Sequence, residues 1–277
     1  MSETTRFFLL QTTLIAVVLV MHTYLGLHII RRMLIFSDLV LDQLAAFGAL
    51  IGVGLGIRYG SPFSYVVAMA VVLVGSGLLA MIKPKTRAIP REAVIGILYV
   101  LALAATLLLG DKLQGGASYV TKALSGSMLW VTWPLVGTTA IVYVALLVFH
   151  YKFRHKFIAL AQTPQNLPNE RLWDFLFFTT QGIITVLIVP IAGVLLAYAF
   201  LMIPAAIAAM LTRKWAGAVI IGWIVGFTAC MFGLGASYLF DFPYGPSLVL
   251  SLGLFFIFTV IMRCVFTQNI TEDTKGS

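Results

Sequence analysis

The chain has very few charged residues for its size. Asp, Glu, Lys and Arg make up 10% of its 277 residues, whereas 61% are hydrophobic and the mean hydropathy is +1.02. A soluble domain carries about 25% charged residues because its surface must be hydrated. This scarcity excludes a soluble enzyme and a disordered chain. It predicts an all-α integral membrane protein in which residues 1–277 form a single transmembrane domain.

Cysteine and catalytic motifs are equally scarce. The two cysteines, Cys230 and Cys264, lie in apolar runs without a CxxC pair, so we expect two small buried residues rather than a disulfide or a thiolate metal site. The sequence contains no GxxxxGK[ST], HExxH or GxSxG motif. The chain is therefore predicted to have no nucleotide site of its own and not to be an enzyme.

Long apolar runs fill most of the chain. A helix needs about 20 apolar residues to cross about 30 Å of hydrocarbon. The runs predict spans at about 7–30, 36–57, 63–82, 92–110, 131–150, 173–190, 192–212, 216–239 and 246–266. The sixth and seventh come from one uncharged stretch in which Pro190, Gly193 and Pro204 are candidate breaks. A bundle of eight spans therefore stays an alternative to nine.

The basic residues are distributed unequally between the two sides that nine spans define. Four of the 18, Arg6, Arg58, Lys112 and Lys122, fall on the side of the N-terminus. The other 14 fall on the opposite side: Arg31, Arg32, Lys83, Lys85, Arg87, Arg91, Lys152, Arg154, Lys156, Arg171, Arg213, Lys214, Arg263 and Lys275. Cytoplasmic loops carry the excess of Lys and Arg. We expect the N-terminus outside and the C-terminus in the cytoplasm.

Two acidic residues lie inside the second apolar run. Asp38 and Asp42 are four residues apart, so a helix places them on one face, and Gln43 lies beside them. Charges within the bilayer are costly and mark ion pathways. Oxygen ligands at this spacing suit a hard cation. The alternative for Asp38 is that it caps the second span together with Ser37.

The histidines give weaker evidence for a metal site than the two acidic residues do. His22 and His28 lie six residues apart in the first run, which turns them to different helix faces and disfavours a shared metal or haem site. His22 is deep enough to join a pathway with Asp42, or else it is a packed, hydrogen-bonded histidine. His150 and His155 belong to a basic inner segment, where we expect them to be solvated.

Three stretches together resemble a known family. They are FSDLVLDQLAAFGALIGV after HIIRRM, then GVLLAYAFLMIPAAIAAMLT, then YLFDFPYGPSLVLSLGLFFIF. In order and spacing they are similar to the membrane permeases of ABC importers for zinc, manganese and iron. That family has an Asp followed four residues later by His in the second span. Here Asp38 matches the first, and the second is Asp42, or Gln43 if the stretch is aligned on Gly48.

The resemblance implies a homodimeric permease in the bacterial inner membrane that works with ABC ATPase subunits and an extracytoplasmic metal-binding protein, without nucleic acid. It implies zinc, manganese or iron as the transported ion and no permanently bound cofactor. The residues it implies for the metal are Asp38, Asp42, Gln43 and His22. Those for coupling to the ATPase are Phe157, Leu160, Gln162, Gln165 and Asn166. The alternative is an ion-coupled secondary transporter of a cation, which has intramembrane acids but often inverted repeats, and we find no repeat.

Overall fold

The computed structural model describes residues 3–82, 89–126 and 131–273. Over these ranges the chain is helical and contains no strand. The helices are α1 (Glu3–Arg32), α2 (Phe36–Gly54), α3 (Pro62–Met81), α4 (Arg91–Lys112), α5 (Gly116–Ser125), α6 (Trp133–Lys152), α7 (Arg154–Gln162), the 3-10 helix η2 (Pro164–Asn166), α8 (Glu170–Leu211), α9 (Trp215–Phe240) and α10 (Tyr244–Asp273). Eight of the described helices are long and apolar enough to cross a membrane. The all-α membrane bundle is confirmed.

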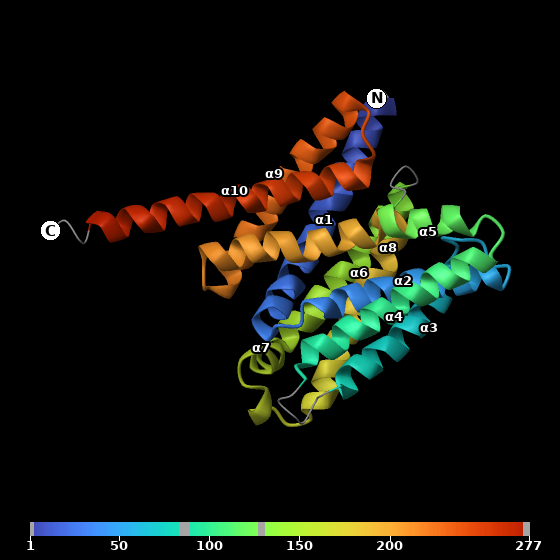
Figure 1. Cartoon of the computed structure of the whole chain (residues 1–277), viewed down its shortest axis with the longest axis horizontal. Helices are drawn as coiled ribbons and strands as arrows, with labels where there is room; N and C mark the ends of the chain where they lie inside the picture. Colours follow the sequence, from blue (N-terminus) through green and yellow to red (C-terminus); the bar gives the residue numbers. More distant parts are fainter. Residues whose placement is uncertain (1–2, 83–88, 127–130, 274–277) are drawn as a thin grey trace.

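Helix α8 is far longer than one crossing requires. Its 42 residues extend about 63 Å at 1.5 Å per residue, twice the thickness of the hydrocarbon. The helix bends at Gly193, where φ is 77° and ψ is 163°, and continues through Pro190 and Pro204. Figure 1 shows the two arms diverging at this bend. Of the three candidate break points, only Gly193 interrupts the helix.

The two arms of α8 run in opposite directions. Near the start of the first arm, Asp174 pairs with Arg32 at the end of α1. Just after the second arm, the carbonyl of Arg213 accepts a hydrogen bond of 3.0 Å from Arg31, at the same end of α1. The chain therefore travels away from this end and returns to it. Counted with each arm of α8 as a separate span, the described helices offer nine candidate crossings, and counted with α8 as one they offer eight.

The bend requires glycine, which gives a first prediction. A φ of 77° with a ψ of 163° is a conformation adopted essentially by glycine alone, and a Cβ on Gly193 would overlap the backbone of Gly126. We expect Gly193→Ala to destabilise the protein by about 3 kcal/mol or more. Gly253→Ala is the control, since a Cβ on this α10 residue meets no neighbour within 4 Å. Thermal unfolding in detergent that shifts equally for both variants would contradict the role of the bend.

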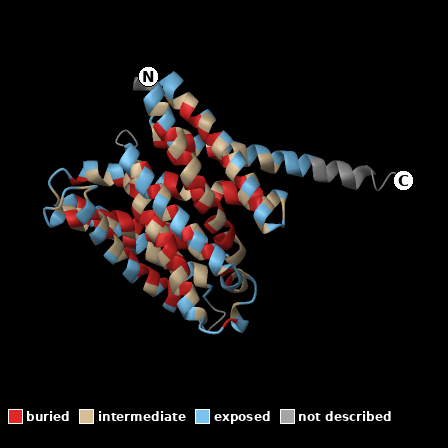
Figure 2. Ribbon diagram, turned by 180° about the vertical axis from the view of Figure 1, so that it is seen from behind, coloured by how far each residue is buried: buried red, intermediate tan, exposed pale blue. Residues whose placement is uncertain are grey.

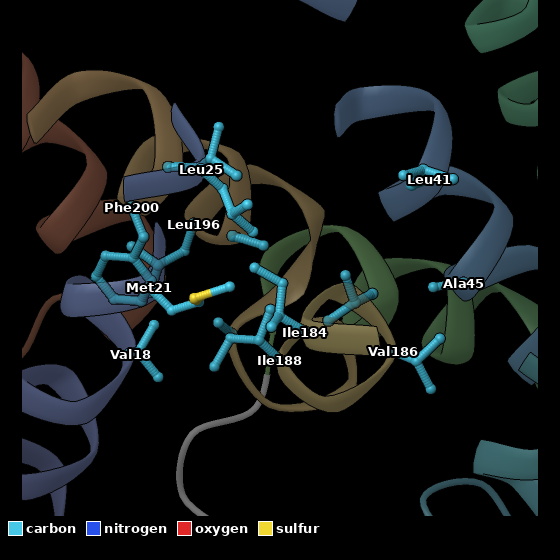
Figure 3. Packing of buried hydrophobic residues seen from close by; sticks show 14 of the residues in the cluster. Val18, Met21, Leu25, Leu41, Ala45, Ile184, Val186, Ile188, Leu196 and Phe200 are labelled. Atoms are coloured by element: carbon cyan, nitrogen blue, oxygen red, sulfur yellow. The ribbon is translucent and has the colours of Figure 1, made fainter. Parts of the chain in front are cut away.

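The core lies where α8 packs on α1 and α2. Figure 3 shows Met21 and Leu25 of α1 beside Phe200 of the second arm, with Ile184 and Ile188 of the first arm next to them. All five side chains are fully or almost fully buried. Helices α2, α3 and α4 gather on one side of this centre, and α9 and α10 on the other (Figure 1). Buried residues accordingly concentrate in the middle of the bundle (Figure 2).

Helix α10 contradicts the expectation that both cysteines are buried. It projects from the bundle, and most of its described side chains are exposed or only partly buried (Figures 1 and 2). Cys230 of α9 is buried as expected, but Cys264 of α10 is exposed. The expectation for Cys264 was wrong because apolar sequence marks both protein-facing and lipid-facing positions in a membrane helix.

The two longest connections are also more ordered than a loop. The connection between α4 and α6 contains α5, and the connection between α6 and α8 contains α7 and η2. Helix α8 begins after Asn169, which adopts a left-handed φ of 58° and whose side chain makes no capping hydrogen bond. Lys83, Lys85, Arg87 and Lys275 lie outside the described residues.

Candidate functional site: a carboxylate pair enclosed by helices

Asp38 and Asp42 lie on α2 and are almost completely buried, with exposed fractions of 2% and 1%. Asp38 does not cap its helix: α2 has no side-chain cap, and Ser37 instead bonds to a carbonyl of the preceding turn. The Asp38 Oδ1 accepts a hydrogen bond of 2.8 Å from the Gln181 Nε2 of α8. The capping alternative is therefore wrong, and the carboxylate faces the first arm of α8.

The surroundings of the pair are rich in acceptors and poor in donors. Among the described residues, the second oxygen of Asp38, both oxygens of Asp42 and the Oε1 of Gln181 have no hydrogen-bond partner. Thr185 approaches Asp42 without completing a bond of ordinary geometry. Buried charge without compensation costs several kcal/mol. A cation or a proton must neutralise this pair when the site is enclosed.

His22 of α1 is held by two neighbours, Val18 and Tyr143. Its Nδ1 lies 3.0 Å from the Val18 carbonyl oxygen, which can only accept, so Nδ1 carries the proton. In a neutral imidazole this leaves Nε2 as the lone-pair donor that metals bind, an arrangement common among metal-ligating histidines. The ring stacks on Tyr143 of α6 at 5.8 Å, and Tyr143 lies within electrostatic range of Asp38 and Asp42.

Gln43 turns toward a different helix. Its Nε2 donates to the Thr106 Oγ1 of α4 at 2.8 Å, while Asp38 bonds to α8. Within the described ranges, no group of three or more His, Cys, Asp or Glu side chains is placed to hold a metal ion. Among the described residues of one copy, Asp38 and Asp42 are therefore not joined by a third His, Cys, Asp or Glu side chain placed to hold a metal ion.

A buried ion cluster ties the helices together at the end of the bundle nearest Asp38. Asp174 of α8 is fully buried and pairs with Arg32 of α1 and, at 3.5 Å, with Arg91 of α4. The neighbouring Glu92 accepts a hydrogen bond of 2.7 Å from the backbone of Phe36, the first residue of α2. Sequence reasoning missed this cluster because all its members lie close to predicted span ends, where charge is ordinary.

The histidine expectation is wrong for His150. This residue is 2% exposed, and its Nε2 lies 2.9 Å from the Thr180 Oγ1. Its ring stacks on Phe157 with 4.1 Å between centroids. Helix α6 extends past His150 to Lys152, so the histidine is enclosed by neighbouring helices rather than solvated. His155, the second residue of α7, is exposed as expected.

The residues implied for coupling fall into two groups. Phe157 and Leu160 are buried and anchor α7 to the bundle. Gln162, Gln165 and Asn166 are exposed along the end of α7 and η2. In this conformation only the second group is free to contact another protein.

Two cavities lie on the side of the bundle away from α7. One, of 380 Å³, is lined by Arg58, Lys122, Tyr59 and Tyr65, and burial raises the pKa of the Tyr59 hydroxyl. The other, of 420 Å³, is an apolar trough between α3 and α6 that shares Tyr65. Neither is lined by the carboxylate pair, so passage of an ion requires the enclosing helices to separate.

Comparisons with known proteins agree with this architecture. The model of the ABC 3 transport family matches residues 3–263. An uncharacterized membrane protein of Synechocystis is 28% identical over 85% of this chain and 83% of its own length. A probable metal transport system membrane protein of Chlamydia pneumoniae is 26% identical over 74% of this chain and 72% of its own. The structure of PsaBC from Streptococcus pneumoniae in complex with Fab has a similar fold, with a TM-score of 0.73 at 21% identity over 90% of both chains.

Proposed function

The chain belongs to the ABC 3 transport family, and from this membership we propose that it is the permease through which an ATP-driven importer moves divalent transition-metal ions. A metal cargo is supported by the names of the Chlamydia relatives, which are probable metal transport system membrane proteins. Zinc and manganese are the leading candidates, and iron is the third. The chain contributes the membrane pathway, and separate ATPase subunits hydrolyse the nucleotide.

The observation that carries the proposal is the unsatisfied carboxylate pair. Asp38 and Asp42 are buried in a membrane bundle with three of their four oxygens unpartnered among the described residues. Acids inside a membrane bundle are kept for ion pathways. If Asp42 rather than Gln43 takes the place of the family's histidine, the site gains a hard oxygen ligand. Carboxylate oxygens suit manganese and iron better, whereas imidazole nitrogen suits zinc. His22 would supply one nitrogen.

A second copy of the chain would complete the coordination shell. One copy presents two carboxylates, whereas metal sites use four to six ligands. The apolar trough between α3 and α6 lies against the same arm of α8 that carries Gln181, so a partner seated there would approach the pair. The two copies would then alternate between states open to one side and to the other.

The membrane orientation follows from charge. We propose that the end of the bundle with Arg31, Arg154 and Lys214 faces the cytoplasm, because cytoplasmic loops carry the excess of Lys and Arg. The exposed residues of α7 and η2 lie at this end, where ATPase subunits would dock. The cavity with Arg58 and Lys122 would face the extracytoplasmic metal-binding protein.

The proposal is tested by reconstitution. The permease is placed in liposomes with its ATPase and binding protein, and uptake of zinc, manganese and iron is measured with and without ATP. We expect uptake of at least one metal to depend on both ATP and the ATPase. Uptake that persists without the ATPase, driven by a proton or sodium gradient, would instead identify an ion-coupled secondary transporter.

A second prediction concerns the exposed residues that we propose couple the permease to the ATPase. Replacing Gln165 and Asn166 together by alanine removes exposed polar contacts without disturbing the buried Phe157 and Leu160. We expect about a tenfold loss of transport-linked ATP hydrolysis, the effect of losing about 1.4 kcal/mol of subunit contact. His155→Ala, at an exposed position of the neighbouring α7, is the control. Full activity of the double variant would remove these residues from the ATPase interface.

A further inference from the structure

A groove lies between α6, α7 and α9 at the basic end of the bundle. It has a volume of 260 Å³ and Tyr24 of α1 lines it. Its sides include Leu147, Ile158 and Val219, which are apolar. Helices α6 and α9 both pack on α1 without packing closely on each other, which leaves the groove between them.

The rim of the groove is cationic. Arg154 lines it at the start of α7, and the exposed Lys214 immediately precedes Trp215, a groove residue that begins α9. The guanidinium of Arg31 lies 3.7 Å over the Trp215 ring. In the part of the chain that the structure describes, no acidic side chain forms an ion pair with Arg31, Arg154 or Lys214.

The groove also contains an unused polar group. His150 lines it, is 2% exposed and has no partner for its Nδ1 among the described residues, while its Nε2 faces Thr180. The combination is an apolar slot with one buried polar atom and a positive rim. Its volume is below the range of about 300–1,000 Å³ usual for sites that enclose whole small molecules. The groove therefore fits one part of a longer molecule whose remainder lies outside it.

We propose that the groove binds an anionic phospholipid of the cytoplasmic leaflet, with part of one acyl chain against Leu147, Ile158 and Val219 and the phosphate beside Arg154 and Lys214. Anionic lipids concentrate in that leaflet, and basic pockets between membrane helices bind their headgroups. The assignment rests on the orientation in the proposed function. The lipid joins α7, whose exposed end faces the ATPase subunits, to α9, so it holds the coupling segment in register with the bundle.

The test is lipid retention by the purified full-length permease. The protein in mild detergent is mixed with phosphatidylglycerol or phosphatidylcholine of identical acyl chains, and bound lipid is counted by native mass spectrometry. We expect phosphatidylglycerol to be retained at least about fivefold better. Arg154→Gln should lower its retention about fivefold and leave phosphatidylcholine unchanged. Ala216→Phe, which fills one wall of the groove, should lower the retention of both lipids.

Lys156→Gln is the matched control, since Lys156 is exposed on α7 but does not line the groove. Equal retention of the two lipids, or equal effects of Arg154→Gln and Lys156→Gln, would overturn the proposal. Displacement of phosphatidylglycerol by inorganic phosphate alone would also overturn it, because the rim would then be a site for free anions. None of these measurements involves transport, so their failure leaves the permease function standing.

Discussion

Asp42→Asn is expected to abolish metal uptake while leaving the protein folded. The change keeps the shape of the side chain and removes one of the two buried carboxylates that we propose for the ion pathway. Losing a buried charged partner costs about 2–5 kcal/mol, which corresponds to a loss of about 30-fold to about 4,000-fold in uptake. Both Asp42 oxygens lack partners among the described residues, so removing the charge relieves an unfavourable burial. Thermal stability should therefore stay the same or rise.

A loss of uptake without a loss of stability is the result that would identify Asp42 as part of the pathway. Uptake is measured in liposomes containing the whole importer, and unfolding is followed in detergent on the permease. Asp111→Asn is the control, because Asp111 is an exposed acid beside Lys112 at a helix end. It should change neither quantity. Normal uptake by Asp42→Asn would exclude the carboxylate pair from the pathway, whatever its effect on folding.

The centre of the site could be predicted from sequence because charge in an apolar run is visible in one dimension. Asp38 and Asp42 stand out for this reason, and the structure buries both on one helix. Their partners could not be found in the same way. Gln181 is a single amide in another run, and Tyr143 is one aromatic residue in an apolar helix. Only the folded arrangement, in which α8 packs on α2 and α6 packs on α1, brings them near the pair.

The fold, like the site, could be predicted from the sequence only in part. Hydropathy locates each membrane passage, and the cluster of Pro190, Gly193 and Pro204 marks the stretch where α8 turns back. Hydropathy does not distinguish a proline tolerated within the helix from the glycine at the bend, since that choice depends on the close approach of Gly126. Hydropathy also does not show which side of a membrane helix faces protein and which side is exposed. This is why Cys264 could not be assigned to the exposed face of α10.

The largest expected loss of stability comes from Asp174→Ala. Asp174 is the shared partner of Arg32 and Arg91, and the Arg32 and Asp174 side chains are 6% and 0% exposed. Removing the carboxylate leaves two guanidinium groups in a buried region of the bundle with their common counter-charge gone. Breaking a buried pair in this way costs about 3–5 kcal/mol. We expect Asp174→Ala to unfold at a much lower temperature in detergent than the unchanged chain.

A double variant separates lost charge compensation from lost packing. Arg32→Met combined with Asp174→Leu removes the buried pair and replaces it with apolar side chains, which restores much of the stability in proteins where the exchange fills the space well. We therefore expect the double variant to be more stable than Asp174→Ala alone. An effect of Asp174→Ala within about 0.5 kcal/mol, typical of surface positions, would contradict the cluster. Because Asp174 lies seven residues before Gln181 on the same arm of α8, this cluster also fixes the arm that faces the carboxylate pair.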